Sequence, residues 1–155
     1  MILYYTRTQK TKVFAEALHE IHNLPLHKLE TELDSMGDLK FMFRSLGSVF
    51  TGRECPVSNM PPSVPGEIYL CGPIWGGAPA APVKYFLKHM DLSKTTVNLV
   101  LTASTPVDKY KTRALEELAK ANCIPGNAYI FATGKDLPEK DTVIQQMGEI
   151  LQGEN

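Results

Sequence analysis

A cluster of hydroxyl side chains directly follows the first apolar run of the chain. Thr6, Thr8 and Thr11 come after the run Met1–Tyr5, and a helical pattern begins where the threonines end. The first turn of a helix leaves backbone N–H groups without partners, and the helix dipole favours negative charge there. Threonine hydroxyls add further donors, so this turn predicts a phosphate site. A plainer interpretation, in which Thr8 only caps the helix, stays open at this point.

A second unusual stretch is Gly72–Gly77, which reads Gly-Pro-Ile-Trp-Gly-Gly and is expected to be a turn. It follows the short apolar run Glu67–Cys71. The indole of Trp75 offers a large apolar face, and glycines let a backbone approach a ligand closely. These features favour a functional role for Trp75, although packing or a subunit interface would also account for a tryptophan here.

Five short apolar runs alternate with five helical patterns along the chain. The runs predict strands at Met1–Tyr5, Leu24–Leu29, Glu67–Cys71, Val97–Leu101 and Tyr129–Ala132. Apolar residues at helical spacing predict helices at Val13–Ile21, Met36–Phe50, Val83–Met90, Tyr110–Ala121 and Val143–Leu151. This alternation predicts a three-layer α/β fold, a five-stranded parallel sheet with helices on both faces. Right-handed crossovers leave few topologies, and the strand order 2-1-3-4-5 suits this count.

The expected strand order brings the two unusual stretches together. In such a sheet, ligands bind beyond the carboxyl ends of the first and third strands, where the winding direction reverses. The threonine turn follows the first strand, and Gly72–Gly77 follows the third. We therefore expect both to border one binding site.

Composition narrows the class of protein. The 155 residues suit a single domain spanning residues 1–155, and 43% hydrophobic with 21% charged residues is typical of a globular chain. A formal net charge of −1 argues against nucleic acid or an anionic membrane surface as partner. Cys55, Cys71 and Cys123 have no metal or redox spacing, and no signal peptide is visible, so reduced thiols and a cytoplasmic location are expected. His19 and His22 are too few ligands for a metal site, and none is expected.

The two motifs carry a family resemblance. Tyr5–Thr11 with Ala15–Leu18 resembles the phosphate loop and first helix of the flavodoxin family, and Gly72–Gly77 with Pro79 and Pro82 resembles its second flavin loop. The resemblance runs through the whole chain and is weak between Glu30 and Pro65. It implies a flavodoxin-like fold with FMN as cofactor. The residues that it places around FMN are Thr6, Arg7, Thr8, Gln9, Lys10, Thr11, Pro73, Ile74, Trp75, Gly76, Gly77, Ala103, Ser104, Thr105 and Tyr110.

Gln9 departs from the family pattern, because the family's phosphate loop usually has glycine there. A glutamine at positive φ would cost about 1 kcal/mol or more. We expect instead that Thr8 is the N-cap and that Gln9 is a helical residue with ordinary φ. Lys10 is expected to add positive charge that flavodoxin phosphate loops commonly lack.

Three functions are compatible with these features, and catalytic residues stay unassigned because no nucleophilic triad can be assembled. The first is an FMN-dependent reductase of small or quinone-like acceptors, with a reduced nicotinamide as electron donor. The second is an electron-transfer flavodoxin serving a redox protein, which the net charge of −1 disfavours because such carriers are usually strongly acidic. The third is a flavodoxin-like binding module that has lost FMN, which Gln9 favours.

The helical segment Met36–Phe50 suggests an oligomer. Phe41, Met42 and Phe43 are consecutive, and no helix can turn all three towards one core. Exposed apolar surface is usually hidden, most often in dimers. We therefore expect a homodimer, with this segment at or near the interface and close to the site.

Overall fold

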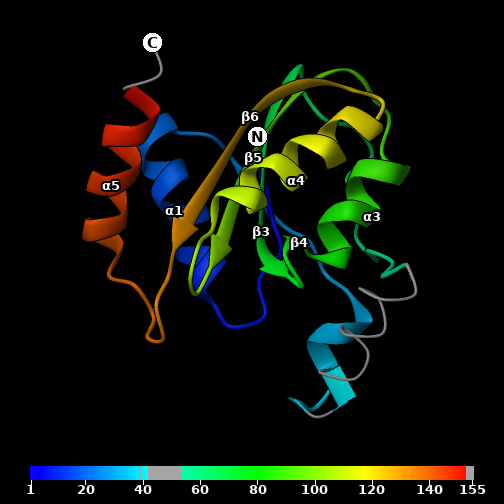
Figure 1. Ribbon diagram of the computed structural model, residues 1–155. Coiled ribbons are helices and arrows are strands. Elements are labelled where there is room, and N and C mark those ends of the chain that lie inside the picture. The colour runs from blue at the N-terminus through cyan, green and yellow to red at the C-terminus, as the bar shows by residue number, and fades with distance from the viewer. Residues whose placement is uncertain (39, 42–53, 153–155) are drawn as a thin grey trace.

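The computed structural model describes residues 1–38, 40–41 and 54–152 (Figure 1). Its strands are β1 (Ile2–Tyr4), β2 (Leu26–Lys28), β3 (Glu67–Trp75), β4 (Ala78–Pro79), β5 (Leu92–Ala103) and β6 (Cys123–Ala132). Its helices are α1 (Lys10–His22), the short 3-10 helix η1 (Glu32–Ser35), α3 (Ala81–His89), α4 (Asp108–Lys120) and α5 (Lys140–Gln152). Most of the expected helix Met36–Phe50 lies outside the described residues, since only 36–38 and 40–41 of it are described.

The sheet has the order β2-β1-β3-β5-β6, and every neighbouring pair along this path is parallel. The predicted five-stranded parallel sheet in the order 2-1-3-4-5 is therefore confirmed. The additional strand β4 is a two-residue antiparallel partner of the end of β3. Because β1 lies between β2 and β3, with Tyr4 opposite Cys71, the carboxyl ends of β1 and β3 are neighbours.

Helices cover both faces of the sheet, which confirms the three layers. Figure 1 shows α1 and α5 on one face and α3 and α4 on the other. Side chains alternate along each strand, so Ile2 packs under α1 and α5 while Leu3 packs under α3 and α4. Phe14 of α1 and Phe86 of α3 are fully buried in these two cores, and each burial contributes about 2–3 kcal/mol.

Three strands are longer than the apolar runs predicted. β3 continues through Gly72 to Trp75, because Pro73 still pairs with Thr102 of β5 and keeps the chain extended. The expected turn Gly72–Gly77 is therefore wrong in its first part, and only Gly76 and Gly77 reverse the chain, both at positive φ. β5 and β6 likewise extend beyond their apolar runs because they pair with each other. No described helix is long and apolar enough to cross a membrane.

Candidate functional site

Two adjoining cavities lie at the carboxyl ends of β1, β3 and β5. The first, the threonine-loop cavity, has a volume of about 240 Å³ and is lined by Arg7, Thr8, Lys10, Thr11, Phe41, Pro73, Ile74, Trp75, Thr102, Ala103, Ser104 and Thr133. The second, the glycine-turn cavity, has a volume of about 430 Å³ and is lined by Ile74, Gly76, Gly77, Ala103, Ser104, Thr105, Lys109, Tyr110 and Arg113. They share Ile74, Ala103 and Ser104, so together they form one cleft.

The cleft brings together nearly all of the residues that the sequence singled out. Of these, only Thr6 and Gln9 line neither cavity. Sequence reasoning missed five lining residues: Phe41, Thr102, Lys109, Arg113 and Thr133. Lys109 and Arg113 could have been found, because they flank Tyr110 at helical spacing at the start of an expected helix. Phe41 comes from a distant segment, and no local pattern indicates its position.

The threonine hydroxyls occupy different environments. The hydroxyls of Thr11 and Thr102 are 2.8 Å apart, and this hydrogen bond ties α1 to β5 under the cleft. Thr6 is 3% exposed, and its Oγ1 is buried without a hydrogen-bond partner among the described residues. Such a buried unpaired hydroxyl costs about 1–3 kcal/mol, so the turn between β1 and α1 carries a local cost in stability.

Gln9 is the N-cap of α1 and has φ 64° and ψ −9°, the left-handed conformation. The expectation that Thr8 caps the helix and that Gln9 is helical is therefore wrong. The chain uses a left-handed residue to turn from the end of β1 into α1, and this is the conformation that a glycine adopts most easily. The glutamine side chain makes no capping hydrogen bond, so nothing local offsets a strain of about 1 kcal/mol.

Arg7 is committed to the segment that follows β2. Its guanidinium donates to the carbonyl oxygens of Leu33 and Met36 at 2.5 and 2.6 Å and forms an ion pair with Asp38 at 3.0 Å. It also lies over the ring of Phe41. Arg7 thus lines the threonine-loop cavity, but its guanidinium mainly holds the segment that follows β2 in place beside this cavity.

The ammonium of Lys10 is also partly engaged in hydrogen bonds within the protein. Its ammonium donates to the carbonyl oxygens of Gly134 and Lys135 at 2.7 and 2.8 Å, which ties the loop after β6 to the start of α1. A lysine ammonium has three N–H donors, so one remains for an anion in the cavity. The positive charge expected at this turn is present beside it.

Trp75 contacts two other aromatic rings. The ring of Tyr5 is 5.7 Å from the indole at 87°, and the ring of Phe41 is 5.2 Å away at 79°. Both are edge contacts of the kind that aromatic pairs prefer. Trp75 is half-buried and packs against the core as well as lining the cavity.

Burial raises the pKa of the Tyr5 hydroxyl well above its usual range, so this hydroxyl stays neutral.

The turn Gly76–Gly77 is clamped by α4. Arg113 Nη1 donates to the carbonyl oxygens of Gly76 and Gly77 at 3.4 and 3.3 Å. Gly77 has φ 85°, and a Cβ there would lie 2.5 Å from Arg113 Nη1 and 3.3 Å from Tyr110 Cε1. The positive φ favours glycine at this position, and any side chain here would also displace the Arg113 guanidinium from its present place.

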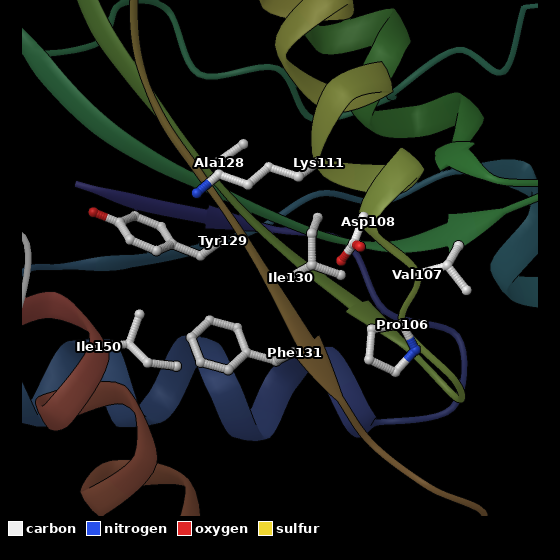
Figure 2. A pocket seen from close by; sticks show the side chains of 9 residues that line it. All are labelled: Pro106, Val107, Asp108, Lys111, Ala128, Tyr129, Ile130, Phe131 and Ile150. Atoms are coloured by element: carbon white, nitrogen blue, oxygen red, sulfur yellow. The ribbon is translucent and has the colours of Figure 1, made fainter.

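A separate cavity of about 320 Å³ surrounds the edge strand β6. Its lining residues are Pro106, Val107, Asp108, Lys111, Ala128, Tyr129, Ile130, Phe131 and Ile150 (Figure 2). It shares no residue with the cleft, and none of its residues was predicted as a site residue. Nowhere in the described part of the chain do three or more His, Cys, Asp or Glu residues gather as metal ligands would.

Comparisons with known proteins agree on the fold. No family model matches the chain, and no curated protein matches its sequence. Three solved structures are similar: a candidate flavoprotein from Bacteroides uniformis (17% identity, 96% of each chain covered, TM-score 0.77), a flavoprotein from Lactobacillus acidophilus in complex with FMN (21%, 95% of this chain and 96% of that one, TM-score 0.62) and a WrbA-like flavodoxin from Agrobacterium tumefaciens (10%, 96% and 92%, TM-score 0.53). With identities this low the likeness concerns the architecture, and by that architecture the chain has the flavodoxin-like fold.

Proposed function

We propose that the cleft binds FMN and that the protein is an FMN-dependent reductase of small or quinone-like acceptors, supplied by a reduced nicotinamide. The observation that carries the proposal is the meeting of the threonine turn and Gly76–Gly77 at one cleft, although they are far apart in sequence. Its position at the carboxyl ends of neighbouring parallel strands is where such sheets bind ligands. The similar Lactobacillus acidophilus structure contains FMN, which supports the same choice of ligand here.

The residues present fit the two ends of FMN. At the threonine turn, the α1 N-terminus, one N–H of Lys10 and the side chain of Thr8, which lines the cavity, would hold the phosphate. Further along the cleft, Ile74 and Trp75 offer apolar surface to a flat ring, and the backbone of Gly76 is accessible to a ring edge.

Bound FMN would supply the redox chemistry, namely hydride exchange with the nicotinamide and two-electron reduction of the acceptor. The balanced reaction consumes one reduced nicotinamide, one quinone and one proton, and it yields the oxidised nicotinamide and a quinol. The chain's own residues would bind and orient the reactants, and Trp75 would limit the access of water to the ring.

A binding module without FMN is the second candidate, because two features of the phosphate turn favour it. Gln9 stands where a flavodoxin usually has glycine, and two of the three N–H donors of Lys10 are already engaged. An electron carrier for a protein partner is supported less well, because a net charge of −1 gives little electrostatic steering.

Titration of the apoprotein with FMN, followed by flavin fluorescence, distinguishes these functions. We expect quenching with a dissociation constant in the micromolar range or below. Absence of quenching at about 100 μM protein, equivalent to binding weaker than roughly −5.5 kcal/mol, would reject FMN and leave the binding module. If FMN binds, oxidation of reduced nicotinamide that depends on an added quinone supports the reductase, and oxidation only with an added redox protein supports the carrier.

We further propose a homodimer formed by a single domain over residues 1–155. The segment Met36–Phe50 would lie at or near the interface. Of its aromatic residues, Phe41 contacts Arg7 and Trp75, and residues 42–50 lie outside the described part of the chain. Light scattering at about 50 μM tests this, and a monomer would end the dimer proposal.

Three free cysteines support a reducing, cytoplasmic compartment.

A further inference from the structure

The glycine-turn cavity is positively charged. Lys109 and Arg113 are its charged lining residues, and no carboxylate of the described residues lines it. Within the part of the chain that the structure describes, Lys109 forms no ion pair. Among the described residues, Arg113 makes the two long hydrogen bonds from Nη1 to the carbonyls of Gly76 and Gly77 and no other. The remaining donors of its guanidinium, on Nη2 and Nε, stay available.

The arrangement of these charges on α4 is unfavourable without a counterion. Lys109 and Arg113 are four residues apart, so they share a helix face, where like charges repel. Lys109 also lies in the first turn, at the positive end of the helix dipole. The acid of this turn, Asp108, lines the cavity around β6 instead of the cleft, as Figure 2 shows. An anion between Lys109 and Arg113 would relieve all of these repulsions.

The cleft has a second cationic site at its other end, which separates this anion from the phosphate of FMN. Lys10 and Thr11 line only the threonine-loop cavity, whereas Lys109 and Arg113 line only the glycine-turn cavity. Ile74 and Ala103 lie between them and belong to both. If the phosphate is held at the threonine turn, the charges on α4 are left for a different anionic group.

We propose that Lys109 and Arg113 bind an anionic group, a carboxylate or sulfonate, of the small electron acceptor. The planar guanidinium of Arg113 suits such a two-oxygen group, and Lys109 adds a mobile point charge. This inference rests on the proposed reductase function and deepens it by naming the class of acceptor as an anionic quinone-like molecule. The phosphates of a nicotinamide donor have related chemistry, and the test separates the two sources.

The test compares matched pairs of reactants on the FMN-loaded protein by stopped flow. One pair of acceptors is 1,4-naphthoquinone-2-sulfonate and the uncharged 2-methyl-1,4-naphthoquinone; the pair of donors is NADH and the uncharged 1-benzyl-1,4-dihydronicotinamide. In Lys109→Gln we expect the rate at which the sulfonate reoxidises the reduced flavin to fall about fivefold relative to wild type. The rate with the uncharged quinone should stay within about twofold of wild type. Lys111→Gln, which removes the same charge from the same helix but lines the other cavity, should change neither rate.

Two results would overturn the inference. If Lys109→Gln lowers the rates of reaction with both quinones equally, Lys109 does not recognise the anion. If it lowers only the rate of reduction by NADH, the positive charges belong to the donor site. Arg113→Lys serves as a second variant, because it keeps the charge and loses the planar fork; a selective loss with the sulfonate supports the proposal.

Failure of FMN binding would be recognised separately. In that case the proposed function fails, and the anion site is tested on the apoprotein with naphthalene-2-sulfonate, which undergoes no redox reaction. We expect NMR shifts of the Gly76 and Gly77 amides that are lost in Lys109→Gln and kept in Lys111→Gln. No shift in the wild-type protein would refute the anion site itself.

Discussion

The guanidinium carbon of Arg7 lies 4.4 Å from the centre of the Phe41 ring. Phe41 in turn meets Trp75 at 5.2 Å, so a residue of the phosphate turn and the tryptophan at the end of β3 are linked through a third segment. Cation–π and edge-on aromatic contacts of this kind each contribute about 0.5–1.5 kcal/mol. The wall of the cleft is therefore assembled from three separate stretches of sequence, and Arg7 holds two of them together.

Arg7→Gln should destabilise the apoprotein by about 1–3 kcal/mol. The change removes the hydrogen bonds to the carbonyls of Leu33 and Met36 and the contact with Phe41, and it leaves half-buried carbonyls without their charged donor. Urea unfolding measures the loss. Asp38→Asn is the control, because that carboxylate is fully exposed and its ion pair, screened by solvent, should contribute little to stability. Equal losses in the two variants would mean that the ion pair, and not the carbonyl contacts, anchors the segment.

The parts of this fold that the sequence predicts are those that depend on local apolar patterns. The strand order followed from five apolar runs, and the two turns met in one cleft because each follows a strand that the topology makes a neighbour. The positive φ of Gln9 and the commitment of Arg7 to Leu33 and Met36 could not be predicted. The first depends on how the chain must turn into α1, and the second on a segment whose position is fixed only by tertiary contacts.

Stability should fall at alkaline pH because of Cys71. Burial of this thiol in β3 raises its pKa well above the ordinary value of 9.0. Above that value the thiol of the unfolded chain releases its proton, while the buried thiol of the folded chain keeps it. The unfolded state is thereby stabilised relative to the folded state, and the free energy of unfolding decreases as pH rises. Between about pH 7 and about pH 10 the loss should be about 1 kcal/mol.

Comparison of wild type with Cys71→Ala by urea unfolding at both pH values isolates this contribution. The substitution lowers stability at neutral pH by removing buried sulfur, and it should reduce the additional loss at alkaline pH. Cys123→Ala is the control, because burial also raises the pKa of this thiol but the side chain is only partly buried. An unchanged alkaline loss in Cys71→Ala would assign that loss to other groups.

Trp75→Ala should weaken both FMN binding and the apoprotein. The indole lines the cavity, so its removal should cost about 1–3 kcal/mol of FMN affinity. The indole also packs on Tyr5, Phe41 and the core, so the apoprotein should lose stability as well. Trp75→Phe keeps a ring and should recover most of the stability. Fluorescence titration and urea unfolding separate the two effects, and an unchanged FMN affinity in Trp75→Ala would make Trp75 a packing residue only.

Gln9→Gly should stabilise the apoprotein by about 0.5–1 kcal/mol, because glycine adopts φ 64° without strain. FMN affinity should change less than about threefold, since a strain that is present with and without the ligand cancels from the binding free energy. Asn23→Gly is the matched control: Asn23 ends α1 at φ 51°, it lines neither cavity, and its replacement should stabilise without altering FMN binding. Urea unfolding gives the stability of both variants, and fluorescence titration gives their affinity. A tenfold gain in affinity for Gln9→Gly alone would mean that the turn changes conformation on binding, with glutamine strained mainly in the bound form.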